Sequence, residues 1–467
     1  MSKNLLDGNL MKGLDYFFKA RSVAVVGAST RPGKIGHEIL RSLVEGEYRG
    51  KVYPVNPKAD EILDLKCYKS VSEIPAEVDL AVLSIPPRAV PGVIEDCGEK
   101  DVKAIVIVSG GFKEVGPEGE ELERKSVEIA RKYWIRIIGP NCIGVFDGDS
   151  RLDTFFQSRE RMMRPPKGNI AFLTQSGTFG CAFLEWAAED GIGISKFVSY
   201  GNRADVNEAD LIRYLGQDQE TRVIAIYTES ISHGRSFMEA CLEVSRIKPI
   251  VVLKSGRTEQ GSRAAVSHTG SMAGSYEVVS AAFKQCGAIE VKTFEELYDV
   301  SKALSMLPFA AGPRIAMVTN GAGPCVMAVD EIVQRGMYLA EYSEKTRKEL
   351  RKRLPSYAIV GNPVDLTGSA TMKDYEVSMQ LLLEDMEVDI LMLFFVFQDT
   401  PLEDEIVEVV KDMKEYGKPI LAVACGGPYT KKQSKELQKR GIPVFSSPER
   451  AVAAAHALYV AAKHMSR

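Results

Sequence analysis

The sequence predicts an α/β protein built from three successive open parallel sheets. Short apolar segments recur along the chain, each ends at Gly, Ser or Asn, and a segment with helical spacing of apolar residues follows. This alternation is typical of parallel strands joined by crossover helices. A length of 467 residues also favours several domains, because one hydrophobic core rarely organises so long a chain.

The predicted strands fall into three groups that two irregular segments separate. The segment 151–167 is charged and contains Arg-Pro-Pro-Lys, and we interpret it as a linker. The sequence LPFAAGP at 307–313 marks the second boundary by its Pro and Gly content. The expected domains therefore cover 1–150, 165–307 and 313–467. Their expected strands are 22–26, 51–55, 80–85, 104–108 and 136–138; 169–174, 195–200, 223–227, 250–253 and 288–291; and 314–319, 390–395, 420–424 and 444–445.

Composition and charge exclude several classes of protein. The net charge of −4 and the absence of a Lys/Arg-rich block argue against extended nucleic-acid binding. The longest apolar segment, 390–397, suits a buried strand and is too short to span a membrane, and the N-terminus does not resemble a signal peptide. Eight cysteines without a CxxC pair predict reduced thiols, a cytoplasmic location and no metal site on this chain.

The first candidate site is the glycine-rich turn in VAVVGASTRPGKIGHEIL. Anions bind where a parallel strand ends and a helix begins, because free N–H groups and the helix dipole attract them. This is not a Walker A loop, because five residues separate Gly27 from Gly33 and Ile35 follows Lys34. The spacing also departs from G-x-G-x-x-G. The turn alone is compatible with a phosphate site or with a plain tight turn.

The end of the second predicted strand narrows the choice of ligand. A nicotinamide-binding fold normally places Asp or Glu there for the ribose hydroxyls, but the sequence VYPVNPK gives Asn56 and Lys58. A lysine pairs with a phosphorylated ribose, so coenzyme A, with its 3′-phosphate and pyrophosphate, suits this site better than NAD. NADP stays open on these two residues alone. The turns SIPP at 84–87 and SGGF at 109–112 end the next strands at the same sheet edge, as ligand contacts or as ordinary turns.

Two further strand–helix turns are candidate phosphate sites. The second domain opens with GNIAFLTQSGTFG, in which Ser176, Gly177 and Thr178 follow a strand and precede a helix. The third domain repeats this device in TNGAGP, where residues 320–323 lead into a helix that we expect to start near Pro324. Two converging helix N-termini would hold one anion firmly, but sequence does not reveal convergence.

One histidine stands out from the other four. His268 lies in a long polar loop rich in Gly, Ser and Ala, after a buried strand. Such a loop suits either an imidazole that moves between two sites or an ordinary solvated histidine. An imidazole nucleophile needs a partner on its second nitrogen, and Glu229 at the end of VIAIYTES is the candidate. We expect surface or helix-packing roles for the histidines at 37, 233, 456 and 464.

In combination these motifs resemble the nucleoside-diphosphate-forming acyl-CoA synthetases, which include succinyl-CoA synthetase. The motifs VNPK, GPNCIG at 139–144, TQSGT, YGNRADVNEADLIRYLGQD at 200–218 and SHTGS around His268 occur in family order. The third domain adds TNGAGP and GNPVDLTG at 361–368. Succinyl-CoA synthetase carries the equivalent domain on its other subunit, so the chain is most similar to α subunits of the archaeal-type ADP-forming acetyl-CoA synthetases.

The resemblance implies a role for each domain and for individual residues. It implies a Rossmann-like CoA-binding domain over 1–150, a flavodoxin-like ligase domain over 165–307 and a third, flavodoxin-like ligase domain over 313–467. His268 would be the phosphohistidine, and Glu229 the carboxylate that orients it. Phosphate would bind at Ser176, Gly177, Thr178, Gly321, Ala322 and Gly323. Coenzyme A would contact Gly27, Ser29, Gly33, Lys34, Ile35, Val55, Asn56, Pro57, Lys58, Ile85, Pro86, Ser109, Gly110 and Asn141.

The resemblance also implies a reaction and a partner. Acyl-CoA and phosphate would give acyl phosphate, His268 would take the phosphoryl group, and ADP with Mg²⁺ would accept it to make ATP. No Walker A loop or ATP-grasp segment is visible, so the nucleotide site is expected on an ATP-grasp β subunit, in an α2β2 assembly. Cys181 stands where the succinyl enzymes carry a tyrosine, which favours a small or apolar acyl group such as acetyl.

Two other functions would each fit part of the sequence. An NADP-dependent oxidoreductase would use the first domain but leaves the other two and His268 unexplained. A non-catalytic CoA-sensing protein would keep the first turn yet tolerate the loss of His268 or Glu229, and both are present. Binding of CoA against NADP, and phosphate labelling of the protein, would separate these functions.

Overall fold

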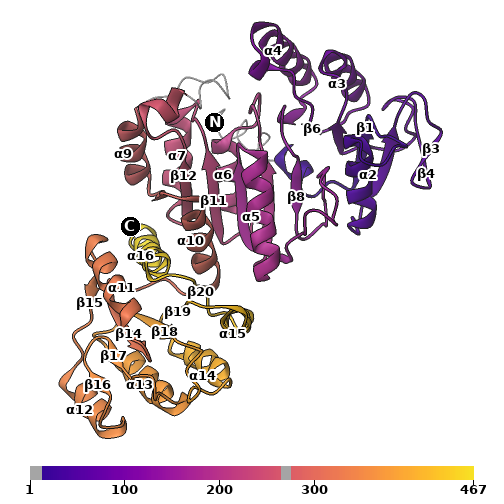
Figure 1. Cartoon of the computed structure of the whole chain (residues 1–467). Helices are drawn as coiled ribbons and strands as arrows, with labels where there is room; N and C mark the ends of the chain where they lie inside the picture. The colour runs from indigo at the N-terminus through magenta and orange to yellow at the C-terminus, as the bar shows by residue number, and fades with distance from the viewer. Residues whose placement is uncertain (1–12, 264–274, 467) are drawn as a thin grey trace. The chain divides into compact units, whose positions relative to one another are not determined.

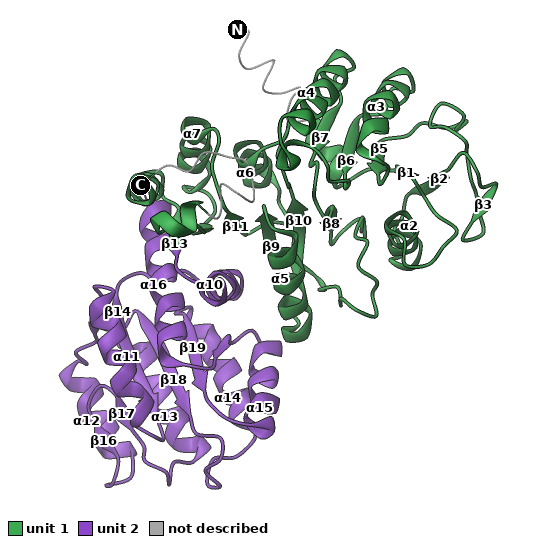
Figure 2. Cartoon of the chain, turned by 45° about the horizontal axis from the view of Figure 1, so that its top comes forward, with its two compact units in different colours: residues 1–290 green, residues 291–467 purple. Residues whose placement is uncertain are grey.

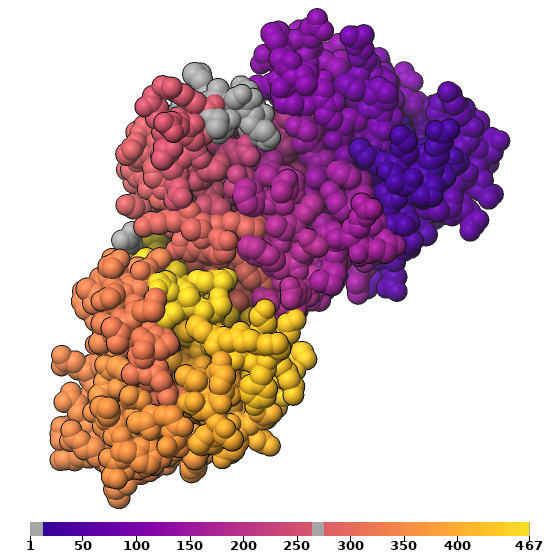
Figure 3. Space-filling view, viewed as in Figure 1, coloured from indigo at the N-terminus to yellow at the C-terminus, as the bar shows by residue number. Residues whose placement is uncertain are grey.

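The computed structural model describes residues 13–263 and 275–466, which form an α/β protein with three main sheets (Figure 1). The fold class predicted from the sequence is confirmed. Helices flank each sheet. Figure 3 gives the same view in space-filling form, coloured along the chain. No helix in the described part of the chain is long and apolar enough to cross a membrane.

The first sheet has five parallel strands in the order β2-β1-β5-β6-β7. Its strands β1, β5 and β6 are buried along their whole length, since apolar side chains fill both faces. In the register of β1, Val26 lies beside Val55 and Leu83, so three carboxyl ends share one edge. The elements of this part are η1 (Asp15–Phe17), β1 (Ser22–Val26), α2 (Ile35–Glu45), β2 (Lys51–Val55), the hairpin β3 (Glu61–Ile62) and β4 (Leu65–Lys66), β5 (Leu80–Leu83), η2 (Pro87–Ala89), α3 (Val90–Glu99), β6 (Ala104–Ile107), η3 (Lys113–Val115), α4 (Pro117–Lys132) and β7 (Arg136–Ile138).

The second sheet has the order β13-β12-β11-β9-β10-β8. Its edge strand β8 is antiparallel to β10 and lies in a segment, 145–147, for which no strand was predicted. Three residues are too few to show periodicity, but burial on both faces holds them in the sheet. The elements are β8 (Val145–Asp147), β9 (Lys167–Thr174), α5 (Gly177–Asp190), β10 (Ile194–Ser199), α6 (Glu208–Gln217), β11 (Val223–Thr228), α7 (Gly234–Val244), β12 (Ile250–Lys254), α9 (Tyr276–Cys286) and β13 (Ile289–Val291).

The third sheet has the order β16-β17-β14-β18-β19-β20, and β15 pairs with β14 beside this path. The strands β14, β18, β19 and β20 are parallel neighbours, whereas β16 and β17 form an antiparallel pair at one edge. The elements are α10 (Phe294–Met306), β14 (Arg314–Thr319), α11 (Gly323–Gln334), β15 (Tyr338–Leu339), α12 (Glu344–Arg353), β16 (Ile359–Val360), β17 (Val364–Asp365), α13 (Met372–Glu384), β18 (Ile390–Phe395), α14 (Ile406–Asp412), η4 (Met413–Tyr416), β19 (Ile420–Ala424), α15 (Pro428–Lys439), β20 (Val444–Phe445) and α16 (Pro448–Met465).

The segment 151–167 was predicted to be a linker, and the structure corrects this interpretation. Asp153 is completely buried, and its Oδ2 accepts hydrogen bonds from Arg159 Nη2 at 3.0 Å and from Arg164 Nε at 2.8 Å. Phe155 packs between Phe146 and Phe197. The charged residues that suggested exposure therefore neutralise one another around a buried carboxylate, and the segment is part of the packed structure.

The chain forms two compact units, residues 1–290 and 291–467 (Figure 2). In the first unit one continuous apolar core joins residues of both sheets, such as Val25 and Val106 with Leu173 and Ile226. The second unit has a core of its own around β14, β18 and β19. Helix α10, which we assigned to the second domain, packs on α16 and belongs to the second unit.

Candidate functional site

The glycine-rich turn after β1 is tightly built. Gly27 has a positive φ of 89°, and a Cβ there would lie 2.4 Å from the carbonyl oxygen of Ser84. A Cβ on Gly36 would lie 2.0 Å from the carbonyl oxygen of Gly27. Helix α2 begins after Lys34 without a capping side chain. The turn thus brings backbone close to a helix N-terminus, an arrangement that favours an anion.

Neighbouring side chains fix this turn in place. Asn56 Nδ2 donates to the carbonyl oxygen of Ala28 at 2.7 Å, while its Oδ1 accepts the N–H of Lys58 at 2.8 Å. His37 is buried, with Nδ1 at 2.7 Å from the carbonyl oxygen of Ser29, in line with the packing role expected for it. The side chain of Lys58 is exposed, which leaves a cation beside the turn.

The ends of β5 and β6 and the loop after β7 meet at the same edge. Ser109 Oγ donates to the carbonyl oxygen of Ile85 at 2.6 Å. The N–H of Asn141 donates to the carbonyl oxygen of Ser109 at 3.0 Å. A Cβ on Gly110 would lie 3.3 Å from Asn141 Oδ1. The predicted contacts from three separate segments therefore lie together.

The second sheet carries a hollow of about 320 Å³ at the carboxyl ends of its strands. Ser176 is the N-cap of α5, and its Oγ accepts the N–H of Phe179 at 3.5 Å. Glu229 follows β11 and is 8% exposed. The hollow is lined by Ser176, Phe179, Tyr227, Glu229, Ser255, Gly256 and Gly261. Two residues predicted for different roles, Ser176 and Glu229, thus share one cavity.

Gln175 and Lys254 hold the backbone around Glu229, and the sequence did not single out either residue. Gln175 Oε1 accepts the N–H of Glu229 at 2.8 Å and that of Ser230 at 3.2 Å. Lys254 Nζ donates to the carbonyl oxygen of Glu229 at 2.7 Å and to that of Ser255. Burial lowers the pKa of Lys254, and the charge of Glu229 opposes that change. The motif TQSGT and the strand 250–253 were recognised in the sequence, but neither gave a role to Gln175 or Lys254, because these contacts join segments far apart in the chain.

The predicted phosphohistidine, His268, lies outside the described residues. Ser255, Gly256 and Gly261, which line the hollow, precede it along the chain. Its position relative to Glu229 stays a prediction. Cys181 is on α5, one turn after Ser176 and the helix start, and burial raises the pKa of its thiol.

The loop after β14 repeats the construction of the loop after β9. The N–H of Ser176 donates to Thr174 Oγ1 at 3.1 Å, and the N–H of Gly321 donates to Thr319 Oγ1 at 2.9 Å. Each threonine hydroxyl donates in turn to the carbonyl oxygen of the same partner, at 2.8 Å in both loops. Helix α11 then begins at Gly323, close to the predicted start. The two loops lie in different compact units, and their convergence stays a prediction.

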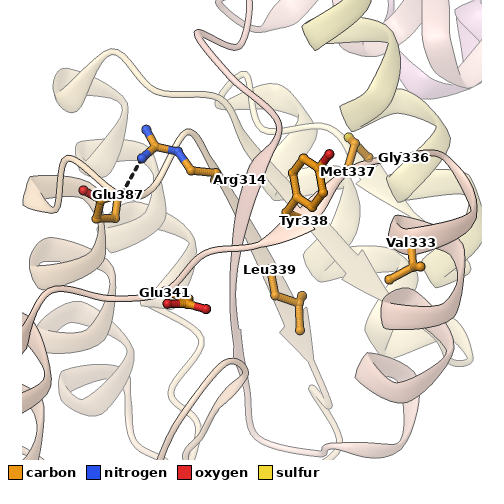
Figure 4. A pocket seen from close by; sticks show the side chains of 8 residues that line it. All are labelled: Arg314, Val333, Gly336, Met337, Tyr338, Leu339, Glu341 and Glu387. Carbon is orange, nitrogen blue, oxygen red and sulfur yellow. Dashed lines mark hydrogen bonds and ion pairs between the residues drawn. The ribbon is translucent and has the colours of Figure 1, made fainter.

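A larger hollow, of about 580 Å³, lies in the second unit and contains none of the predicted site residues (Figure 4). Arg314 Nη1 donates to Glu387 Oε2 at 2.6 Å at its rim, and Tyr338 and Leu339 of β15 form its wall. None of the residues that line this hollow is a predicted site residue, so its size alone does not make it the site of chemistry.

Comparison with protein families agrees with the three sheets. Residues 21–147 match a CoA binding domain, residues 167–304 a succinyl-CoA ligase like flavodoxin domain, and residues 315–467 a ligase-CoA domain. These ranges follow the order of the first, second and third sheets.

Comparison with individual proteins extends the match to the whole chain. The chain is 45% identical over 458 residues to the α subunit of acetate–CoA ligase [ADP-forming] II of Pyrococcus furiosus, covering 97% of this chain and 98% of the relative. It is 43% identical over 453 residues to the α subunit of isoform I of that organism, covering 96% and 97%. The dinucleotide-forming acetyl-coenzyme A synthetase 1 of Ca. Korarchaeum cryptofilum, solved with phosphate and ADP, is similar in structure with a TM-score of 0.90, 41% identity and 97% coverage of both chains. The chain therefore belongs to the α subunits of the ADP-forming acetate–CoA ligases, within the succinyl-CoA ligase-like superfamily.

Proposed function

We propose that this α subunit passes the energy of an acyl thioester to a phosphoryl group on His268, from which a partner subunit makes ATP. The observation that carries this proposal is the hollow shared by Ser176 and Glu229. It combines a helix N-terminus, which favours a phosphate oxyanion, with a carboxylate that is able to accept an imidazole N–H. The segment that leads to His268 begins at its wall.

Coenzyme A is proposed to bind along the carboxyl edge of the first sheet. The close approach of Gly27 and Gly36 keeps side chains away from the start of α2, which suits a pyrophosphate. Lys58 offers a cation for the 3′-phosphate. The ends of β5 and β6, with Asn141, continue the same edge toward the second sheet.

The proposed reaction has three steps. Orthophosphate attacks the carbonyl carbon of acyl-CoA, a C–O bond forms as the C–S bond breaks, and the CoA thiolate takes the proton that phosphate gives up. The neutral imidazole of His268 attacks phosphorus, an N–P bond forms, and the carboxylate leaves with the P–O electron pair. An oxygen of ADP then attacks the same phosphorus and the N–P bond breaks. Donors at the Ser176 loop offset the charge on phosphate.

A partner subunit follows from the α-subunit names of the relatives. We infer that this partner is an ATP-grasp β subunit that binds ADP and Mg²⁺, that the assembly is α2β2, and that it works in the cytoplasm. Cys181, in place of a larger side chain, supports a small acyl group such as acetyl. An NADP-dependent oxidoreductase finds no support, because all three domains belong to the ligase family.

The experiment is intact-mass analysis of the chain with its partner subunit after incubation with acetyl-CoA, phosphate and Mg²⁺. We expect an acid-labile phosphate adduct that is absent from His268→Ala. His233→Ala is the matched control, because His233 is an exposed histidine of the same domain, and it should keep the adduct.

Two results would contradict the proposal. An adduct of equal yield in His268→Ala would place the phosphoryl group elsewhere. No adduct in the wild-type complex would leave CoA binding without the phosphohistidine route, as expected of a CoA-sensing protein.

A further inference from the structure

Three polar side chains join the loop after β6 and helix α4 to the loop after β10. Asn202 Nδ2 donates to Glu114 Oε2 at 2.6 Å and to Glu123 Oε2 at 2.9 Å. The other oxygen of Glu114, Oε1, accepts the backbone N–H groups of Gly111 at 2.6 Å and Phe112 at 3.3 Å. We call Glu114, Glu123 and Asn202 the Asn202 clasp.

The clasp lies against residues already proposed to contact coenzyme A. A Cβ on Gly110 would lie 3.1 Å from Glu114 Oε1 and 3.3 Å from Asn141 Oδ1. Asn141 Nδ2 in turn donates to Asn202 Oδ1 at 3.4 Å. Both ends of the clasp therefore adjoin one stretch of the sheet edge.

The clasp requires an amide at Asn202, between the two carboxyl groups, and a carboxylate at Glu114, next to the Gly110–Phe112 loop. An amide nitrogen has two hydrogens, and Asn202 uses both. Burial raises the pKa of Glu114, but hydrogen bonds from Asn202 and from Gly111 outweigh it, and the pKa is lowered overall. Burial raises the pKa of Glu123, and the charge of Glu114 adds to this rise. The carboxyl group whose pKa is lowered is thus the one that accepts the N–H groups of Gly111 and Phe112.

The strand order indicates which end of the ligand this loop faces. In the order β2-β1-β5-β6-β7, β6 is two strands from β1, or about 10 Å from the Gly27 turn. A ligand with its phosphates at β1 and β2 would reach β6 with its opposite end. The loop that holds Asn202 follows β10, the neighbour of β9, whose own loop carries Ser176.

We propose that Glu114, acting through Asn202 and the Gly110–Phe112 backbone, is a positioning residue for the pantetheine thioester end of coenzyme A. This inference rests on the proposed function. The clasp sets the loop after β6 relative to the second sheet, and so directs the thioester toward the hollow where phosphate is proposed to attack.

The test is calorimetric titration of the full chain with coenzyme A and, separately, with adenosine 3′,5′-bisphosphate, which lacks the pantetheine arm. Glu114→Gln sets an NH₂ group against the NH₂ group of Asn202, or turns it against the loop amides. We expect it to weaken coenzyme A binding about ten- to a hundredfold, the range for losing hydrogen bonds to a charged group. Binding of the bisphosphate should change by less than about twofold, because its site is two strands away.

Two further variants test whether the effect comes from the clasp or from the loss of any carboxylate in this region. Asn202→Ala removes the same link from the other side and should give the same selective loss. Glu118→Gln changes an exposed carboxylate in the first turn of α4 and should leave both affinities unchanged.

Each outcome bears on a different claim. Equal loss for both ligands, or unchanged coenzyme A affinity in Glu114→Gln, would overturn the positioning role. A wild-type chain that binds neither ligand would overturn the CoA site itself, and this inference with it.

Discussion

Lys196 on β10 is a buried cation whose removal should destabilise the first unit strongly. Its side chain is 1% exposed, and its Nζ lies 3.2 Å from Asp147 Oδ1 and 2.9 Å from Asp218 Oδ2. Asp218 Oδ2 also accepts the hydroxyl of Thr221 at 2.6 Å. Asp147 Oδ1 makes no hydrogen bond within the described residues and depends on this ion pair.

The substitution Lys196→Met keeps the length of the side chain but leaves two buried carboxylates facing each other. Removing one partner of a buried ion pair costs about 3–5 kcal/mol, because the remaining charge is uncompensated. Unfolding entropy is about 2.1 cal/mol/K per residue, so for a unit of 290 residues each kcal/mol lowers Tm by about 1.6 °C. We therefore expect a fall in Tm of about 5–8 °C.

The assay is thermal unfolding at pH 7, with hydrogen exchange of the 194–199 peptide as a local readout. Lys167→Met is the matched control, because Lys167 also bridges two carboxylates, those of Asp149 and Glu220, but is 45% exposed. An exposed pair contributes about 0–1 kcal/mol, so its Tm should change by less than about 2 °C. Equal shifts in the two variants would refute the reasoning that burial sets the cost.

Gly36→Ala should destabilise the chain by about 1–3 kcal/mol and weaken coenzyme A binding, because its Cβ would meet the preceding turn at 2.0 Å. Gly92→Ala is the control: nothing lies within 4 Å of the new Cβ in helix α3, so we expect up to about 1 kcal/mol of stabilisation. Thermal unfolding measures the stability of the two variants, and calorimetry measures their affinity for coenzyme A. Similar results for the two variants would contradict the steric argument. The second prediction concerns His456, whose pKa is lowered below its usual 6.5 by burial and by the charge of Arg335. The imidazole therefore takes up a proton at a higher pH in the unfolded chain than in the folded chain. The stability that neutral His456 contributes is fully present above about pH 6.5 and is lost as the pH falls through the lowered pKa. His456→Gln should therefore reduce the pH dependence of the urea midpoint, measured for the 448–465 peptide by pulsed hydrogen exchange. Parallel curves for the wild type and the variant would contradict this.

Strands with an apolar run were predictable whatever their length. The strands β1, β2, β7, β14, β18, β19 and β20 begin and end where their apolar runs predict, and even the two residues of β20 are both buried. The strands β8, β15, β16 and β17 were not predicted: β15, β16 and β17 are partly exposed and lack an apolar run, and β8 is a short antiparallel edge strand.

The candidate site also has a part that was predictable from the sequence and a part that was not. Ser176 and Glu229 share a hollow as the strand-end argument requires, since parallel strands present their carboxyl ends at one edge. The Asn202 clasp was not predictable, because its members are separated by 88 and 79 residues and form no local motif. The position of His268 stays a prediction.

The shared core of the first unit determines where this chain tolerates rearrangement of its gene. Because the first two sheets share one apolar core, a chain break that separates them would expose a continuous apolar surface on both fragments. The second unit closes its own core, so a chain end introduced after β13, which ends at Val291, would leave both cores intact. Splitting, fusion and exchange of this region between polypeptides therefore carry a low folding cost at one junction and a high cost at the other.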